Sequence, residues 1–330
     1  MDSLTKKTLL TKRGFTYTYY VSPAADPSKP TLLLQHGFPD SAAQWADLIT
    51  CHLQPAGYGA IAPDMLGYAG TSKPTDPAAY KYSGLTADLL EMLDAEGLDR
   101  VISLGHDWGA VSARKLYNLH PERVGGLISI LIGYTPETGQ AFDLDAINAM
   151  SEKALGKGYG MLSYWKFFVA EDGARLLREN ADVLFDALHA PQSFSKVFCR
   201  EGHTRKAIEA RGQGFDLARR EYATEEMKRT FVERLGRDGF EAPVCWYKSV
   251  MSGLQNGEGK AENNVLRVPM LYLPYTGDFL CRPEMMKPVV EAGLVPRLTT
   301  VVMEEGAHWG IVEFPEAFGR TVTGWLDENY

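Results

Sequence analysis

The stretch VISLGHDWG, residues 101–109, decides the fold. Val101–Leu104 is a short, mostly apolar run, which is typical of a strand buried on both faces of a parallel sheet. The residues after Gly109 predict a helix. Gly105 and Gly109 permit a tight turn between this strand and this helix, and such a turn would hold Asp107 above the edge of the sheet. The context predicts a nucleophile elbow whose nucleophile is an aspartate.

The segments around this elbow alternate short apolar runs with helical patterns, which predicts an α/β fold with a mostly parallel central sheet flanked by helices. Ser83 is expected to cap a helix that carries Leu85, Leu89 and Leu93 on one face. A final helix is expected from Pro315 to Asp327. The other predicted strands are Phe15–Val21, Thr31–Leu34, Gly59–Pro63, Val124–Ile132, Met270–Leu273 and Leu298–Met303.

Between about residues 136 and 264 the chain is helical, charged and aromatic, and no run in it must be a core strand. We therefore divide the chain into a first core part, residues 1–135, an inserted helical cap, residues 136–264, and a second core part, residues 265–330. The stretch from Arg200 to Arg237 is crowded with charged residues and is interpreted as solvated helix faces.

Two further residues follow predicted strands in the order that a triad on such a sheet requires, namely nucleophile, acid and base. Asp278 follows the run from Met270, and His308 lies in the sequence GAHW after the last strand-like run. The sequence HGFP at residues 36–39 follows an early strand, where the backbone N–H of Phe38 could join that of Trp108 to form an oxyanion hole.

Together, HGFP, GHDWG and the Asp278 and His308 loops resemble the epoxide hydrolase branch of the α/β-hydrolases. That family uses two cap tyrosines to hold the epoxide oxygen. The segment SYWKFF at residues 163–168 resembles the motif of the first tyrosine, and PVCWYK at residues 243–248 closely resembles that of the second. The resemblance assigns these roles to Tyr164 and Tyr247, and Tyr159 is the alternative to Tyr164.

The resemblance implies a hydrolase that attacks an epoxide carbon with Asp107 and then hydrolyses the resulting ester with water activated by His308, which Asp278 orients. A carboxylate forms a hydrolysable ester, whereas a serine would form a stable ether. No metal or organic cofactor is expected. The partners implied are a small apolar epoxide and water. The residues expected to line the substrate site are His36, Pro39, Trp165, Phe168 and Trp309.

Other readings of the same motifs stay open. A haloalkane or haloacid dehalogenase shares the aspartate nucleophile, and Trp108 could serve either chemistry. Arg114 is the first arginine after Asp107, later than expected for an enzyme that holds a haloacid carboxylate. A receptor could use the fold as a binding module without catalysis. The same site could also open an epoxide within a larger metabolite, in a biosynthetic role.

The composition of the 330 residues narrows the function classes. A formal net charge of −8 argues against nucleic acid as the main partner. No apolar run is long enough to span a bilayer, and the first residues lack the pattern of a signal peptide. Cys51, Cys199, Cys245 and Cys281 show no metal-ligand spacing and are interpreted as free thiols. A cytoplasmic location is expected, and the sequence gives no prediction of oligomeric state.

Overall fold

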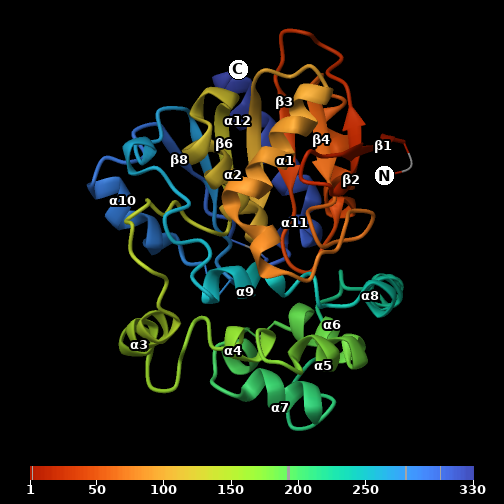
Figure 1. The fold of residues 1–330 in the computed structure, drawn as a ribbon, viewed down its shortest axis with the longest axis vertical. Coiled ribbons are helices and arrows are strands. Elements are labelled where there is room, and N and C mark those ends of the chain that lie inside the picture. The colour runs from red at the N-terminus through yellow and green to blue at the C-terminus, as the bar shows by residue number, and fades with distance from the viewer. Residues whose placement is uncertain (2, 192–193, 279–280, 305) are drawn as a thin grey trace.

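The fold is built on one eight-stranded sheet, as Figure 1 shows. The computed structural model describes residues 1–330 except residues 2, 192–193, 279–280 and 305. The strand order is β1-β2-β4-β3-β5-β6-β7-β8, with antiparallel pairing in β1–β2 and β2–β4 and parallel pairing elsewhere. The strands are β1 Thr5–Leu10, β2 Thr16–Ser22, β3 Thr31–Gln35, β4 Gly59–Pro63, β5 Val101–His106, β6 Val124–Ile130, β7 Met270–Leu273 and β8 Leu298–Thr300. The mostly parallel α/β fold expected from the sequence is confirmed.

Alternate residues of the central strands supply two separate cores, one on each face of the sheet. Leu33 of β3 packs into the cluster that contains residues of helices α1 and α2, whereas its neighbours Leu32 and Leu34 pack into the cluster that contains Trp325 of helix α12. Because both faces are covered, the central strands read as continuous apolar runs. The core helices are α1 Tyr82–Ala95, α2 Trp108–Leu119, α10 Lys287–Glu291, α11 Gly310–Glu313 and α12 Pro315–Asn329.

The structure corrects two expectations about these elements. Strand β1 was not predicted, because its sequence TKKTLL is mostly exposed and pairs only with β2 at the edge of the sheet. Ser83 is not a helix cap. Helix α1 begins at Tyr82, and its first backbone N–H groups, those of Tyr82 and Ser83, donate to the side chains of Gln255 and Glu258, at 3.0 and 2.9 Å.

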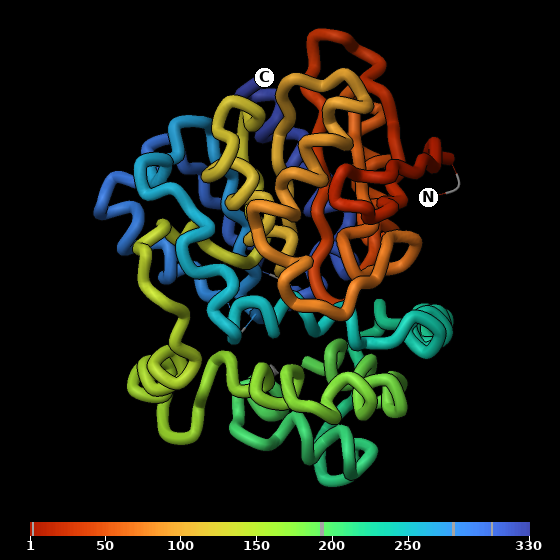
Figure 2. The backbone as a smooth tube through the Cα atoms, viewed as in Figure 1, coloured from red at the N-terminus to blue at the C-terminus, as the bar shows by residue number. Residues whose placement is uncertain are grey.

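Between β6 and β7 the described residues form helices, turns and loops without a strand. In Figures 1 and 2 this segment forms a separate layer below the sheet, with helix α9 next to the core. Its helices are α3 Leu144–Leu155, α4 Trp165–Phe168, α5 Gly173–Glu179, α6 Ala181–His189, α7 His203–Glu209, α8 Glu225–Asp238 and α9 Cys245–Met251. The division at residues 136 and 264 stays a prediction, although this arrangement agrees with it.

The charged stretch within this layer is only partly a solvated surface. Arg229 is exposed and pairs with Glu226. Arg234, in contrast, is half-buried and donates hydrogen bonds to the carbonyl oxygens of Pro39 and Asp40, at 2.8 and 3.3 Å. The stretch therefore also anchors the helical layer to the loop that follows β3.

Two further features agree with the composition. The four cysteines are free thiols. Within the described ranges of the chain, no helix combines the length and the apolar character that a membrane span needs.

Candidate active site

Asp107 lies at the turn between β5 and α2 in a backbone conformation that non-glycine residues rarely adopt, with φ 53° and ψ −126°. Two glycines make the turn possible. A Cβ atom on Gly105 would lie 2.0 Å from the carbonyl oxygen of Gly109, and a Cβ atom on Gly109 would lie 1.9 Å from the carbonyl oxygen of Gln35. Only glycine fits at either position, so the predicted elbow is present and holds the Asp107 carboxylate above the sheet.

The loop after β3 contacts this carboxylate directly. The backbone N–H of Phe38 donates to Asp107 Oδ1 at 2.8 Å. The backbone N–H of Trp108 also hydrogen-bonds to the Asp107 side chain. A Cβ atom on Gly37 would lie 2.4 Å from the Asp107 side chain, so the close approach requires glycine. The two amides expected to form an oxyanion hole thus converge on Asp107.

His308 and Asp278 lie beside Asp107 and are buried. His308 Nδ1 lies 2.8 Å from Asp278 Oδ2, and His308 Nε2 lies 3.7 Å from Asp107 Oδ2. The backbone N–H of Cys281 donates to Asp278 Oδ1 at 2.9 Å, which fixes the second carboxylate oxygen. The structure therefore brings the three predicted triad residues together, with the histidine between the two carboxylates.

The electrostatics of these groups are coupled. Burial raises the pKa of Asp107, while His308 and the amides of Trp108 and Phe38 act in the opposite direction. Burial lowers the pKa of His308, but the hydrogen bond and charge of Asp278, together with the charge of Asp107, outweigh burial and leave that pKa raised. A histidine placed between two carboxylates is therefore a stronger base than an isolated one.

One neighbouring residue was not singled out from the sequence. The His106 side chain donates through Nε2 to the carbonyl oxygen of His308 at 2.8 Å. Burial, and then the charge of His308, lower the pKa of His106 to about 3, so its ring is neutral. The contact holds the backbone of the His308 loop against the elbow. Its position next to Asp107 in the sequence was the only available signal.

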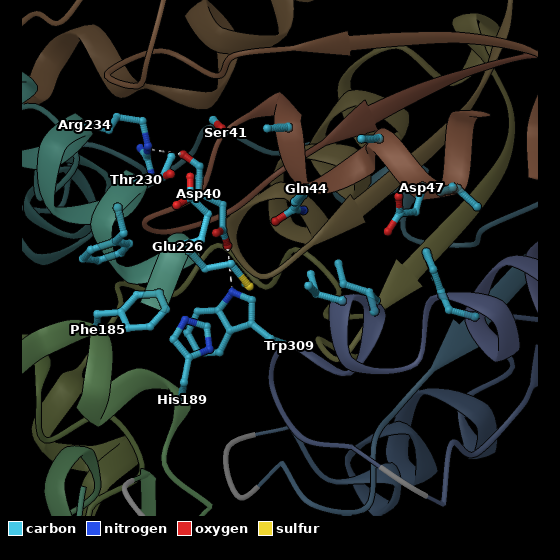
Figure 3. Close-up of a pocket in the computed structure, with 18 residues that line it drawn as sticks. Asp40, Ser41, Gln44, Asp47, Phe185, His189, Glu226, Thr230, Arg234 and Trp309 are labelled. Atoms are coloured by element: carbon cyan, nitrogen blue, oxygen red, sulfur yellow. Dashed lines mark hydrogen bonds between the residues drawn. The ribbon is translucent and has the colours of Figure 1, made fainter. Parts of the chain in front are cut away.

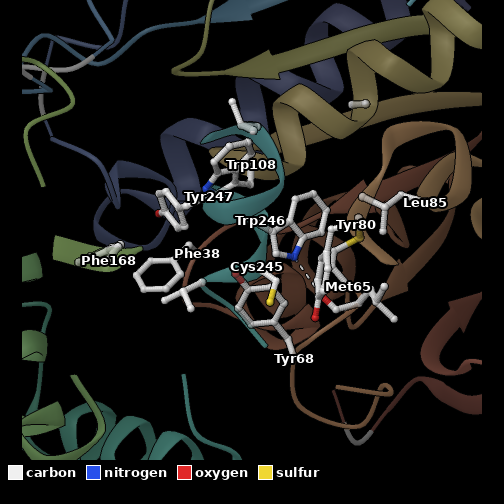
Figure 4. Close-up of a cluster of buried hydrophobic side chains, with 14 of the residues drawn as sticks. Phe38, Met65, Tyr68, Tyr80, Leu85, Trp108, Phe168, Cys245, Trp246 and Tyr247 are labelled. Atoms are coloured by element: carbon white, nitrogen blue, oxygen red, sulfur yellow. Dashed lines mark hydrogen bonds between the residues drawn. The ribbon is translucent and has the colours of Figure 1, made fainter. Parts of the chain in front are cut away.

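Two tyrosines of the helical layer face Asp107 from the opposite side. Tyr164 directly precedes α4, Tyr247 lies within α9, and their ring centroids are 6.0 Å apart. Tyr247 packs edge to face against the rings of Phe38 and Trp108, at 5.3 and 5.1 Å (Figure 4). Burial first, and then the charge of Asp107 among others, raise the pKa of both tyrosines, so both hydroxyls keep their protons at neutral pH.

Tyr159, the alternative to Tyr164, is placed differently. It belongs to a small buried cluster with Cys199, and it lines neither of the two cavities that reach Asp107. Tyr164 lines both of these cavities. Of these two tyrosines, Tyr164 is therefore the one that lines the cavities at Asp107.

Two cavities meet at Asp107. The larger has a volume of about 250 Å³ and includes Trp165 among its mostly apolar lining, and the smaller has a volume of about 20 Å³ and includes Phe168 and Trp309. These three residues thus line cavities that reach Asp107, and their contact with a substrate stays a prediction. The residues shared by both cavities are Asp107, Tyr164 and His308.

His36 and Pro39, the other two residues expected to line the substrate site, belong to neither cavity. His36 Nδ1 donates to the carbonyl oxygen of Gly37, and Nε2 accepts from the backbone N–H of Met65, both at 2.9 Å. Burial lowers the pKa of His36 to about 3, which keeps the ring neutral for these two bonds. Both residues shape the loop that presents Phe38 to Asp107.

A third pocket, of about 420 Å³, lies between the core and helix α8 on the far side of Trp309 (Figure 3). Trp309 Nε1 donates to Asp40 Oδ2 at 3.0 Å, and the Trp309 ring packs against His189 with centroids 4.6 Å apart. Burial raises the pKa of Asp40 to about 6, against the hydrogen bond from Trp309 and the charge of Arg234. Trp309 thus forms part of the wall between this pocket and the small cavity at Asp107.

The described residues contain no group of three or more histidine, cysteine, aspartate or glutamate side chains arranged to hold a metal ion. Besides Asp107, the ionisable side chains among the described residues that line the two cavities include His308, Cys281 and the tyrosines. The chemistry available to these groups is nucleophilic attack by a carboxylate, proton donation by phenols and proton transfer by an imidazole.

This chain is similar to several known proteins in sequence and in fold. The chain is 26% identical over 310 residues to bifunctional epoxide hydrolase 2 of Sus scrofa, covering 92% of this chain and 52% of that protein. It thus spans about half the length of that relative. It is also 26% identical over 333 residues to epoxide hydrolase srdG of Neurospora crassa, covering 96% of this chain and 93% of that protein.

The crystal structure of epoxide hydrolase A from Mycobacterium thermoresistibile superposes with a TM-score of 0.78 at 22% identity, covering 98% of each chain, and so shares the fold. The model of a family described as the alpha/beta hydrolase fold matches residues 30–315, which is most of the sequence. Sheet order, elbow and family model lead to one conclusion: the chain belongs to the alpha/beta hydrolase fold family.

Proposed function

We propose that the protein is an epoxide hydrolase that converts an apolar epoxide to a vicinal diol. The observation that carries this proposal is the placement of two tyrosines, the half-buried Tyr164 and the buried Tyr247, opposite an aspartate at the nucleophile elbow. Phenol hydroxyls that keep their protons suit an oxygen that becomes negatively charged as a ring opens. The similarity to proteins named epoxide hydrolases supports the same activity.

In the first step the Asp107 carboxylate attacks one ring carbon from the side opposite its bond to oxygen. A C–O bond to Asp107 forms as the ring C–O bond breaks. Tyr164 and Tyr247 hydrogen-bond to the departing oxygen, and one of them donates its proton, which leaves a phenolate and a hydroxyalkyl ester. The raised pKa of each tyrosine means that forming the phenolate is unfavourable. A hydrogen bond from the hydroxyl of the other tyrosine would offset part of this cost.

In the second step His308 takes a proton from water, and the hydroxide formed attacks the carbonyl carbon of the ester. The backbone amides of Phe38 and Trp108, which contact the Asp107 carboxylate, would stabilise the oxyanion; losing one such donor typically costs about 3–4 kcal/mol of barrier. Collapse releases the diol, whose alkoxide takes the proton from His308. The remaining proton of the water returns to the phenolate, and Asp107 is regenerated as a carboxylate.

Asp278 orients His308 in this scheme. Its carboxylate accepts the Nδ1 proton at 2.8 Å, which leaves Nε2 as the basic nitrogen on the side of Asp107. We further propose that the helical layer, residues 136–264, is a cap that supplies both tyrosines and about half of the apolar lining of the larger cavity. Trp165, Phe168 and Trp309 are then substrate-contacting residues, whereas His36 and Pro39 act through the loop.

The proposal is tested by incubating the purified protein with apolar epoxides and, separately, with haloalkanes, and by measuring diol and halide release. Diol formation that is lost in the variant Asp107→Asn supports the proposal. Halide release without diol formation would assign a dehalogenase, which uses the same aspartate. Binding of either class without turnover would assign a receptor on the same fold.

A further inference from the structure

The two cavities that meet at Asp107 differ greatly in size. The larger cavity has a volume of about 250 Å³ and the smaller about 20 Å³, and Asp107, Tyr164 and His308 belong to both. Tyr247 belongs to the smaller one. The groups that would open an epoxide therefore stand where a wide space narrows abruptly into a confined one.

The larger cavity can accept a bulky apolar group. Apart from Asp107 and His308 its lining consists of apolar, aromatic and cysteine side chains. An apolar cavity of about 150 Å³ is already large enough to bind benzene, so a cavity of 250 Å³ has room for a phenyl ring or a branched chain. The residues around this space include Trp108, Val111, Phe142, Met161, Leu162, Trp165, Val250 and Met285.

The smaller cavity cannot accept a bulky group. A space of about 20 Å³ holds one group of the size of a water molecule or a methyl group. Its walls are buried side chains that pack on one another: the rings of Phe38 and Phe168 lie 5.0 Å apart, and Leu188 is 6% exposed. Close-packed walls of this kind resist expansion, because a larger group would force them from their preferred positions.

One wall of the smaller cavity is formed by Trp309, which is held in a fixed position. Trp309 lines both the smaller cavity and the 420 Å³ pocket, whose lining Figure 3 shows. The hydrogen bond to Asp40 and the packing against His189 hold the indole in place. On this side the indole therefore blocks a substituent that enters the smaller cavity.

From this asymmetry we propose that the protein acts on epoxides with one bulky apolar substituent, that is, on terminal epoxides or on those whose second ring carbon carries no more than a methyl group. The inference rests on the epoxide hydrolase function proposed above. The ring lies between Asp107 and the two tyrosines, and its single large substituent lies in the larger cavity. Epoxides with a bulky group on each ring carbon are excluded because one group must enter the smaller cavity.

The test compares kcat/KM for three aromatic epoxides that differ only at the second ring carbon: styrene oxide, trans-β-methylstyrene oxide and trans-stilbene oxide. We expect styrene oxide and its methyl derivative to lie within about tenfold of each other and stilbene oxide to be at least 100-fold poorer. Stilbene oxide turned over as well as styrene oxide would overturn the inference and leave the proposed function intact. No diol from any of the three would count against both.

A matched pair of variants tests whether the wall at Leu188 causes the discrimination against stilbene oxide. Leu188→Ala enlarges the smaller cavity and should raise the ratio of kcat/KM for stilbene oxide to that for styrene oxide at least tenfold. Leu184→Ala makes the same change one turn earlier in helix α6, at a buried residue that lines neither cavity, and should leave the ratio unchanged. An equal change of the ratio in both variants would contradict the assignment of the wall. The milder variant Leu188→Val serves if Leu188→Ala does not fold, with a smaller rise expected.

Discussion

Replacing Tyr247 with phenylalanine removes one hydroxyl from the small cavity and keeps the ring. The ring makes edge-to-face contacts with Phe38, Trp108, Trp165 and Phe168 at centroid distances of 5.1–5.3 Å, and phenylalanine retains all four. The fold should therefore survive, although the hydroxyl also hydrogen-bonds to the Trp108 side chain, and losing that bond should lower the free energy of unfolding by about 1–3 kcal/mol. Any loss of activity then reports on the hydroxyl.

The size of the loss follows from the chemistry at this position. The hydroxyl would donate to an oxygen that gains negative charge, and a hydrogen bond to a charged group contributes about 1.5–3 kcal/mol. That range corresponds to a factor of about 10–150 in the rate of ester formation. Tyr164 lies 6.0 Å away, ring centroid to ring centroid, and can still donate in the variant, which limits the loss. Removing both hydroxyls should cost about 10³-fold or more.

The assay is the single-turnover rate of ester formation on mixing excess enzyme with an epoxide, measured by rapid quenching. Tyr247→Phe and Tyr164→Phe should each slow this step about 10- to 150-fold. Tyr159→Phe makes the same chemical change outside the two cavities at Asp107 and should leave the rate within about twofold. Full activity in the double variant, or an equal loss in Tyr159→Phe, would refute the role given to the two tyrosines.

Three further variants test other parts of the site and the fold. Asp278→Asn should lower the rate of ester hydrolysis by about 10⁴-fold. His308 acts as a base only when it is neutral, and its pKa is raised. In a pH–rate profile, kcat of the wild type should therefore fall with decreasing pH around a midpoint above pH 6.5. This midpoint should move to lower pH in Asp278→Asn, which lacks the charge that raises the pKa of His308. Gly37→Ala places a Cβ atom 2.4 Å from the Asp107 side chain and should reduce diol formation about 100-fold, measured at steady state. Gly324→Ala, in an open and exposed position of helix α12, should instead raise the free energy of unfolding by about 0.5–1 kcal/mol in urea titrations, and an unchanged midpoint would contradict this.

The catalytic end of the sheet was predictable because its signals are local. Strands β5 and β7 are continuous apolar runs, and each is followed closely by one of the polar residues that the fold presents at its carboxyl edge. Glycines on both sides of Asp107 encode the turn directly, since no other residue fits at Gly105 or Gly109. A predicted order of strands therefore sufficed to bring Asp107, Asp278 and His308 together.

Features that depend on contacts between distant segments were not predictable in the same way. The start of α1 is fixed by Gln255 and Glu258, more than 170 residues away in the sequence, so Ser83 misled the prediction. Likewise, only the resemblance of residues 163–168 to a family motif distinguished Tyr164 from Tyr159, and no local pattern indicates which ring faces Asp107. The unequal cavities arise from residues of separate segments, such as Met161 in one and Leu188 in the other, whose distances from Asp107 depend on how the helical layer packs on the core.

The central claim is that Asp107 forms a covalent ester with an epoxide, and the variant His308→Gln tests it most directly because it should form the ester without hydrolysing it. The intact mass of this variant is measured after exposure to an epoxide and, in parallel, to a haloalkane. We expect the mass to rise by one whole epoxide, with the added mass on the peptide that contains Asp107. No added mass, an adduct on another residue, or an adduct from the haloalkane alone would contradict the claim.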